Sequence, residues 1–267
     1  MRPLTEKRLF LLDMDGTIYL DEELFDGTLD FLNYVNRIGG RYLFLTNNSS
    51  RGIDAYLEKM ARLGIPATAD DFLTSTDALI DELRSRGDRK RFYCFGTESF
   101  RRQLSNAGID VVTKLDDTIE GLICGFDTEL TFQKLEGACI LLNRGVEFLA
   151  TNPDWVCPTW YGYVPDCGSV CEMLFKATGR RPRFIGKPER TMAELACKKT
   201  GYSKEESLLV GDRIYTDIAC AVNAGMDSCF VLSGEGVRSD IEKYSISPTY
   251  TLANIRELLK LCEEETQ

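Results

Sequence analysis

Two aspartates separated by one residue follow a short apolar run near the start of the sequence. Residues 8–12 read RLFLL and lead directly into residues 13–17, DMDGT. One carboxylate of such a pair can attack phosphorus and form an aspartyl-phosphate. The other can protonate the leaving oxygen and later activate water. The same letters occur in turns and calcium loops, but the full calcium-loop pattern is absent. We therefore predict Asp13 and Asp15 to be catalytic.

A hydroxyl and two amides follow the second apolar run, residues 41–45. Thr46, Asn47 and Asn48 stand at the point where this strand would end and a helix would begin. Such a turn can cradle a phosphate with its hydroxyl and its successive backbone N–H groups. A loop with a helix N-cap is the alternative for this segment taken alone.

Two further motifs carry charge late in the chain. Lys187 stands between Gly186 and Pro188, where it could neutralise a phosphate and its nucleophile. Asp212 and Asp217 follow the apolar residues 207–210, and paired carboxylates at a strand end suit Mg²⁺. A lone lysine is usually a solvated charge, and one aspartate can simply favour a helix N-terminus. Each of these motifs is weak evidence alone, so the functional interpretation depends on their occurring together.

Composition excludes several other chemistries. The 267 residues include no histidine, which removes Ser-His-Asp and Cys-His catalysis and HExxH metal sites. The net charge of -10 argues against a nucleic-acid partner, and no apolar run is long enough to span a membrane. Without a signal-peptide core, the ten cysteines indicate a reduced, cytoplasmic protein. The spacing of Cys167 and Cys171 resembles a metal pair, but packed thiols are favoured over zinc.

The motifs must be positioned by alternating strands and helices. Strands are predicted at residues 8–12, 41–45, 207–210 and 228–232, with helices at 29–38, 53–63, 215–224 and 255–261. This alternation predicts an α/β fold, a doubly wound Rossmann-like parallel sheet. The middle alternates separately, with strands at 92–95, 121–125 and 146–149 and helices at 100–107 and 132–143. We predict a core of residues 1–78 and 184–267 with a smaller α/β cap, residues 79–183, inserted.

The four motifs in this order resemble the haloacid-dehalogenase-like phosphohydrolases. DxDGT, a Thr at the second strand, a Lys and GDxxxTD are all present, and the resemblance covers nearly the whole chain. TNNSS, the later ATNPD at residues 150–154 and GKP resemble the NagD-like branch, which includes para-nitrophenylphosphatases. That branch carries a large α/β cap between the second and third motifs.

The resemblance implies a role for each matching residue. Asp13 is similar to the family's nucleophile and a Mg²⁺ ligand, and Asp15 to the general acid/base that also offers its carbonyl to the metal. Asp212 resembles the third protein ligand and Asp217 the residue that orients metal-bound water. The remaining matches are the phosphate cradle (Thr46, Asn47, Asn48) and the charge clamp (Lys187).

The cap departs from some pyridoxal phosphatase-like members at one position. Cys157 stands where those members carry a substrate-contacting His, which weakens any prediction of pyridoxal phosphate specificity. Residues 155–163 (WVCPTWYGY) are rich in aromatics. They could line the substrate entrance, with Cys157 in contact with substrate, or instead form a cap core or a homodimer surface.

The resemblance implies Mg²⁺-dependent hydrolysis of a small phosphomonoester. Sugar phosphates, nucleotide monophosphates, phosphoglycolate-like esters and para-nitrophenyl phosphate are the candidate substrates, and a small phosphorylated metabolite is the expected partner. A phosphotransferase or mutase would use the same Asp13, and a non-catalytic phospho-ligand sensor is the remaining alternative. Halide release from carbon is disfavoured because the phosphatase-type Asp15 is present.

Overall fold

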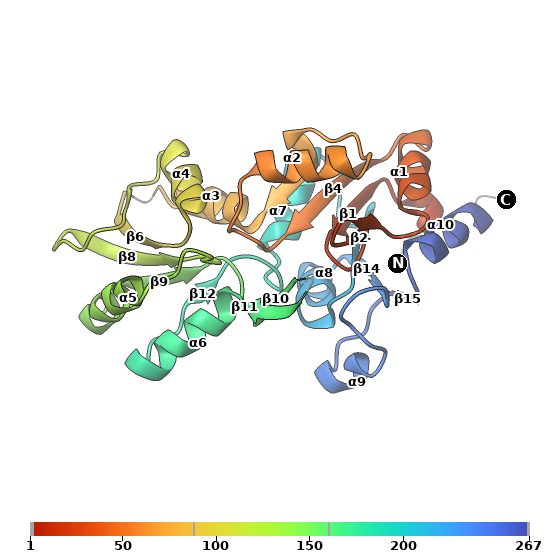
Figure 1. Cartoon of the computed structure of the whole chain (residues 1–267). Helices are drawn as coiled ribbons and strands as arrows, with labels where there is room; N and C mark the ends of the chain where they lie inside the picture. The colour runs from red at the N-terminus through yellow and green to blue at the C-terminus, as the bar shows by residue number, and fades with distance from the viewer. Residues whose placement is uncertain (1–2, 88, 160, 266–267) are drawn as a thin grey trace. The chain divides into compact units, whose positions relative to one another are not determined.

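The chain folds into two compact units, each an α/β structure. The computed structural model describes residues 3–87, 89–159 and 161–265. Unit 1 comprises Met1–Thr46, Tyr56–Leu73 and Lys187–Gln267, and unit 2 comprises Asn47–Ala55 and Thr74–Gly186. Figure 1 shows the elements of both units in the colours of their sequence positions.

Unit 1 is built on a six-stranded sheet. In spatial order its strands are β15 (Tyr250–Leu252), β14 (Asp227–Val231), β13 (Ser207–Gly211), β1 (Leu9–Asp13), β4 (Arg41–Thr46) and β5 (Phe72–Thr74). Strands β13 and β4 flank β1, and both pair with it in parallel. The later strands are therefore added on both sides of the central pair: β4 and then β5 lie beyond β1, and β14 and then β15 lie beyond β13. This is the doubly wound parallel sheet that the sequence predicts, and that prediction is confirmed.

The apolar runs of the sequence form the central strands because both faces of the sheet are covered. Leu9, Phe10, Leu11 and Leu12 have no exposed surface, so they form a continuous buried run rather than an alternating one. The covering helices include α1 (Thr28–Arg37) and α10 (Ile255–Glu264), which pack against each other. The others are α2 (Ile53–Arg62), α7 (Thr191–Thr200), α8 (Ala219–Ala224) and α9 (Asp240–Tyr244). Short helical turns lie at η1 (Leu4–Glu6) and η2 (Ala69–Asp71), and a two-stranded hairpin joins β2 (Tyr19–Leu20) to β3 (Glu23–Leu24).

The helix predicted at residues 215–224 is divided. A π-helical turn, η3 (Ile214–Ile218), precedes α8. The N–H of Ile218 donates to the carbonyl of Arg213, five residues earlier, at 3.3 Å. In the same turn the N–H of Arg213 donates to a carboxylate oxygen of Asp217 at 3.0 Å. The wide turn thus replaces regular helix where Asp217 must be held, and π-turns of this kind often occur at functional sites.

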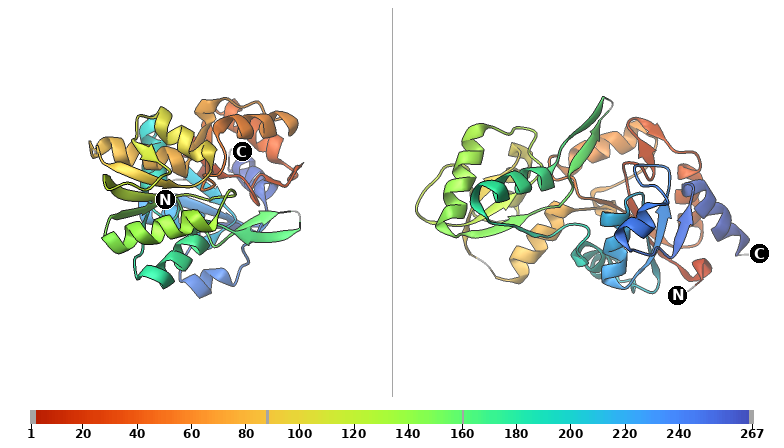
Figure 2. Two further views of the ribbon diagram at one scale, coloured as in Figure 1. Left: turned by 60° about the vertical axis from the view of Figure 1, so that its left-hand side comes forward. Right: turned by 90° about the horizontal axis from the view of Figure 1, so that it is seen from below.

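Unit 2 has its own five-stranded sheet. Its strands, in spatial order, are β12 (Arg183–Phe184), β9 (Glu147–Ala150), β8 (Ile119–Cys124), β6 (Arg91–Phe95) and β7 (Val111–Val112), and the pairings are parallel. Its helices are α3 (Ser75–Ser85), α4 (Glu98–Asn106), α5 (Phe132–Arg144) and α6 (Cys167–Thr178). Helices α5 and α6 pack against each other, and both are visible in the two views of Figure 2. A hairpin of β10 (Val156–Thr159) and β11 (Gly162–Pro165) completes the unit.

The division of the chain differs in detail from the ranges 1–78, 79–183 and 184–267 read from the sequence. Residues 47–55 belong to unit 2, and the later crossings lie after Leu73 and after Gly186. The physical reason at the last crossing is that Phe184 pairs with Ala150 in the sheet of unit 2. At the first, Ser49 bonds to Thr151 at 3.1 Å, so the loop after β4 is tied to unit 2.

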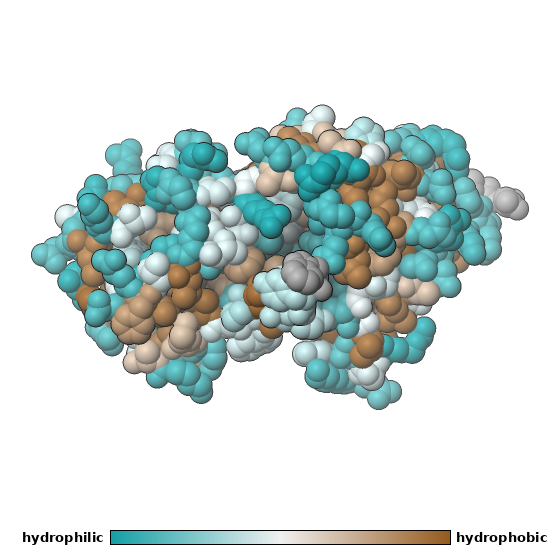
Figure 3. All heavy atoms as spheres, viewed as in Figure 1, coloured by the Kyte–Doolittle hydropathy of each residue, from teal (hydrophilic) through white to brown (hydrophobic). Residues whose placement is uncertain are grey.

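Polar residues cover most of the face shown in Figure 3, with smaller apolar patches between them. Within the residues that the structure describes, no helix is both long and apolar enough to cross a bilayer.

Candidate active site

Asp13 and Asp212 lie at the point of unit 1 where the strand order reverses. Asp13 ends β1, and Asp212 directly follows β13, which is paired with β1. In an open α/β sheet, ligands bind outside the carboxyl ends of the strands at such a switch point. The sheet therefore brings together two carboxylates that lie about 200 positions apart in the sequence.

Lys187 occupies the centre of this carboxylate group. Its ammonium nitrogen lies 2.5 Å from Oδ1 of Asp13 and 2.6 Å from Oδ1 of Asp217. It also donates to the carbonyl of Leu45 at 3.2 Å. The side chain is 2% exposed, so a lone charge here would be costly, and the two carboxylates compensate it.

Backbone donors hold the other oxygens of the later aspartates. The N–H of Glu235 donates to Oδ2 of Asp212 at 2.8 Å, and the N–H of Arg213 donates to Oδ2 of Asp217. Both aspartates are buried. Their carboxylates are therefore fixed by main chain rather than by rotamer choice alone.

Glycines allow the chain to approach Asp212 closely. Gly16 has a φ of +88°, and a Cβ placed on it would lie 2.5 Å from Oδ2 of Asp212. A Cβ on Gly234 would overlap the same carboxylate. Only glycine combines a positive φ with this space, which explains the Gly of the DMDGT segment.

The carboxylates repel one another in the absence of a cation. Burial and the charge of Asp217 raise the pKa of Asp13 well above its ordinary value, although Lys187 lowers it. Burial, followed by the charge of Asp217, raises the pKa of Asp212 to about 7. Burial opposes the charge of Lys187, but Asp13 and Asp217 raise its pKa above the ordinary value. The single positive charge of Lys187 is thus too small to neutralise the three carboxylates of Asp13, Asp212 and Asp217.

This excess of negative charge fits a divalent cation. Asp13, Asp212 and Asp217 each offer an oxygen, and these oxygens lie within 4.8 Å of one another. Carboxylate oxygens are the ligands of hard cations such as Mg²⁺ and Ca²⁺. A cation there would lower the pKa of Asp13 and keep it ionised.

Asp15 lies beside two residues that the sequence analysis missed. The hydroxyl of Tyr19 lies 3.3 Å from Oδ2 of Asp15, and the ammonium of Lys59 lies 3.6 Å from Oδ1. Lys59 also stands 3.7 Å from the centre of the Tyr19 ring. Asp15 itself is 44% exposed, so its carboxylate can exchange protons with solvent. Tyr19 lies only four positions after Asp15, which was a usable signal, but nothing in the sequence marks Lys59.

The three residues of the predicted phosphate cradle stand at a crossing between the units. Thr46 ends β4 in unit 1, and Asn47 and Asn48 begin the segment in unit 2. The side chain of Asn47 donates to Asp154 at 2.8 Å. Oδ1 of Asn48 accepts from the N–H and hydroxyl of Ser50. The amide of Asn47 is thus engaged by Asp154, and the part that these residues take in phosphate binding stays a prediction.

Cys157 lies in β10 opposite Val164 and is half-buried against a hydrophobic cluster of unit 2. Trp155, Tyr161 and Tyr163 on the same hairpin are each more than half exposed. Trp160, also in the stretch singled out from the sequence, lies outside the described residues. The contact of Cys157 with substrate stays a prediction.

A buried lysine between two carboxylates, at the switch point of a parallel sheet, is an arrangement that suits phosphoryl chemistry. The lysine and a cation can stabilise a transferring phosphoryl group. The two aspartates of the DMDGT segment have the chemistry that a nucleophile and a proton carrier need, and these roles stay a prediction.

Comparison with known proteins gives the family. Residues 10–110 match the haloacid dehalogenase-like hydrolase family, and residues 184–258 match a second haloacid-dehalogenase hydrolase-like family. The acid sugar phosphatase of Staphylococcus aureus is 31% identical over 98% of this chain and 100% of its own length.

Solved structures agree. The 4-nitrophenylphosphatase of Thermotoga maritima has a TM-score of 0.90 and 36% identity, covering 97% of this chain and 99% of that one. The glycerol phosphate phosphatase of Mycobacterium tuberculosis, solved in complex with calcium, has a TM-score of 0.88 and 30% identity. The match covers 96% of this chain and 76% of the glycerol phosphate phosphatase chain. The chain belongs to the haloacid-dehalogenase-like hydrolases, and within them it is a NagD-like phosphatase.

Proposed function

We propose that this chain hydrolyses small phosphomonoesters in a Mg²⁺-dependent reaction, through an aspartyl-phosphate on Asp13. The observation that carries the proposal is the position of Lys187, whose ammonium group bonds both Asp13 and Asp217. A cation fixed against a carboxylate orients that carboxylate and stabilises an incoming phosphoryl group.

The first half-reaction transfers the phosphoryl group to the protein. A carboxylate oxygen of Asp13 attacks phosphorus, and the bond between phosphorus and the leaving oxygen breaks. Asp15 gives its proton to that oxygen, so an alcohol departs. Lys187 holds Oδ1 of Asp13 at 2.5 Å and thereby fixes the plane of the nucleophile.

The second half-reaction returns the protein to its starting state. Asp15, now a carboxylate, takes a proton from a water molecule as the water oxygen attacks phosphorus. The bond between phosphorus and Asp13 breaks, and inorganic phosphate leaves. The protons balance, because Asp15 loses one in the first step and regains one in the second.

Mg²⁺ would be held by the carboxylates of Asp13 and Asp212 and the main-chain carbonyl of Asp15, where it would neutralise charge on the phosphoryl oxygens. Asp217 would keep Lys187 in place, since it is bonded to that ammonium at 2.6 Å. We assign the remaining phosphate contacts to Thr46 and the backbone of Asn47 and Asn48.

The relatives support small substrates. They include an acid sugar phosphatase, a 4-nitrophenylphosphatase and a glycerol phosphate phosphatase. We therefore place sugar phosphates first among the candidate substrates, followed by nucleotide monophosphates, phosphoglycolate-like esters and para-nitrophenyl phosphate.

Trapping the intermediate tests the proposal. Radiolabelled substrate is mixed with the protein and Mg²⁺, quenched in acid, and the protein is counted before and after hydroxylamine, which cleaves acyl phosphates. We expect hydroxylamine-sensitive label in wild type. It should accumulate further in Asp15→Asn with para-nitrophenyl phosphate, because this good leaving group departs without an acid while dephosphorylation still needs a base.

Asp13→Asn is the matched control. An amide does not attack phosphorus as a carboxylate does, so the folded variant should carry no label and show no turnover. Label on another residue, or wild-type turnover in Asp13→Asn, would exclude Asp13 as the nucleophile. Phosphate found on an added acceptor alcohol rather than in solution would identify a phosphotransferase instead.

A further inference from the structure

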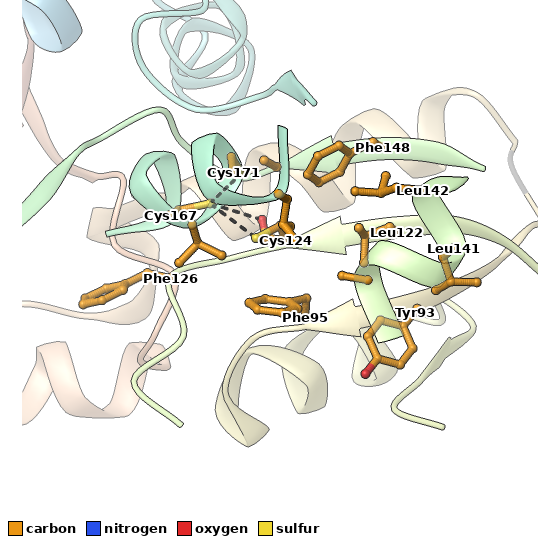
Figure 4. Close-up of a cluster of buried hydrophobic side chains, with 14 of the residues drawn as sticks. Tyr93, Phe95, Leu122, Cys124, Phe126, Leu141, Leu142, Phe148, Cys167 and Cys171 are labelled. Carbon is orange, nitrogen blue, oxygen red and sulfur yellow. Dashed lines mark hydrogen bonds between the residues drawn. The ribbon is translucent and has the colours of Figure 1, made fainter. Parts of the chain in front are cut away.

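Three cysteines meet in the core of unit 2. Cys124 ends β8, Cys167 begins α6, and Cys171 follows one helical turn later. The sulfur of Cys167 lies 3.9 Å from the sulfur of Cys124 and 3.9 Å from that of Cys171. All three sulfurs lie within 4.8 Å of one another, and Figure 4 shows them grouped where β8 ends and α6 begins. We call Cys124, Cys167 and Cys171 the thiol triad.

The triad has the dimensions of a three-sulfur metal site. Two sides of its triangle measure 3.9 Å and the third is no longer than 4.8 Å. A point equidistant from the sulfurs then lies about 2.3 Å from each, which is the length of a typical metal–thiolate bond. A disulfide has sulfurs about 2.0 Å apart, so the three residues are separate thiols, and all are free.

Regular structure holds the three ligands in place. Strand β8 is paired on both sides, with β6 and β9. Helix α6 is capped by Asp166, whose carboxylate accepts from the N–H of Cys167 at 2.5 Å. The triad residues are 0 to 2% exposed. A metal would therefore meet a preformed set of ligands rather than a mobile loop.

The type and number of the ligands favour a soft ion. Aromatic and aliphatic side chains, among them Phe126 and Leu174, belong to the same buried cluster. Within the described residues the cluster contains three ligand groups, whereas zinc in a structural site takes four. Thiolate ligands select soft ions, among them Cu(I) and zinc, and the count of three ligands favours Cu(I) over structural zinc. Burial raises the pKa of the Cys167 thiol, but the neighbouring thiols and the polar groups of Asn152 and Thr151 lower it well below its ordinary value.

We propose that Cys124, Cys167 and Cys171 form a trithiolate site for one Cu(I) ion, which would join the start of α6 to the end of β8. The site uses none of the residues of the phosphatase centre. Each thiol that binds as a thiolate releases one proton to solvent, so copper binding should strengthen as the pH rises.

Metal titration of the full chain tests this site. The reduced, metal-free protein is titrated anaerobically with Cu(I) in competition with a chromophoric copper chelator. One equivalent should bind per chain. Replacing any one triad residue with serine should weaken that binding by more than about 100-fold, because loss of even an outer partner of a metal ligand costs 10- to 100-fold.

Two control variants make the result specific. Cys94→Ser removes a cysteine of unit 2 that is equally buried but lies outside the triad, and it should bind copper normally. The triple variant Cys139→Ser, Cys157→Ser, Cys197→Ser removes the three half-buried thiols, and it too should bind one equivalent. The proposal would be overturned if the wild-type protein bound no copper, or if the triple variant failed to bind it.

Direct observation of the ligands needs no variant. X-ray absorption of the copper-loaded wild type should show three sulfur neighbours at about 2.3 Å. Two neighbours, or nitrogen and oxygen in place of sulfur, would contradict the triad. A zinc titration under the same conditions should give weaker binding, and tighter binding of zinc than of copper would also refute the choice of ion.

Discussion

The ammonium group of Lys187 lies 2.5 Å from the carboxylate of Asp13, although 173 residues separate them in the chain. The same ammonium reaches Asp217 at 2.6 Å. Lys187 therefore serves two purposes at once. It reduces the repulsion between buried acids, and it orients the proposed nucleophile.

Replacing this lysine should remove both effects. In Lys187→Met we expect kcat to fall by about 10²- to 10³-fold, the range seen when one stabilising donor is removed from an active site. Lys260→Met, which changes an exposed lysine of α10, serves as the control and should keep wild-type kinetics. Both are checked by steady-state assay and circular dichroism. A folded Lys187→Met variant with wild-type kcat would refute the role of this lysine.

Loss of the general acid should depend on the leaving group. In Asp15→Asn, turnover of an alkyl phosphate should fall by about 10²- to 10⁴-fold. The release of para-nitrophenol in the first turnover should change far less, because that leaving group needs little protonation. Stopped-flow measurement of the first turnover for both esters distinguishes the two. An equal loss for both would indicate that Asp15 acts through folding or metal binding instead.

Lys59→Met, which removes the ammonium beside Asp15, should lower kcat less than Asp15→Asn does.

The metal-free protein should lose stability as the pH rises from about 4 to about 7. The pKa of Asp212 is about 7 in the folded state, against about 3.9 for an unfolded aspartate. Within this window the folded state holds a proton that the unfolded state has lost, so the free energy of unfolding falls with rising pH. Asp13, whose pKa is also raised, acts in the same direction.

Urea unfolding at a series of pH values, with chelator present, measures this dependence. Asp212→Asn should flatten the slope, and Mg²⁺ should restore stability most at the alkaline end, where the carboxylates are ionised. The same slope in wild type and Asp212→Asn would show that Asp212 does not carry the effect.

Phosphatase activity should disappear with the chelator and return with Mg²⁺. Ca²⁺ should support it poorly, because it is larger and accepts more ligands.

Cys157→Ala should alter substrate selectivity rather than chemistry. If Cys157 contacts the leaving group, its truncation should change the ranking of kcat/KM among esters by roughly tenfold to two-hundredfold. Cys139→Ala is a matched control, because Cys139 is likewise half-buried against the same hydrophobic cluster. One common factor for all substrates, or the same change in both variants, would assign Cys157 a structural role.

The central strands were predictable because their apolar runs are continuous and buried on both faces. The site residues that follow them were predictable for the same reason, since Asp13 and Asp212 each come directly after such a run. The role of Lys187 could be inferred only from the presence of the other motifs, because no local sequence pattern indicates a contact with Asp13. The acids and the lysine each stand in a recognisable motif, whereas the bond between them is a property of the fold.

Features that depend on distant contacts were missed. Lys59 reaches Asp15 only because of how α2 lies in unit 1. Cys124 joins Cys167 because parallel strands and a helix bring positions 43 residues apart together. Asn47 belongs to unit 2 because it bonds to Asp154, 107 residues away. Periodicity describes one segment at a time, so it does not report such pairs.

The chain passes between the two units at points that coincide with the proposed chemistry. Thr46 is the last residue before one crossing, and Lys187 is the first residue after another. Insertions within unit 2 leave both residues in place as long as the ends of the inserted unit are unchanged. A single residue added or lost between β12 and Lys187 would instead shift the lysine relative to Asp13. The interior of unit 2 can therefore diversify in evolution, while the length of its junctions is constrained.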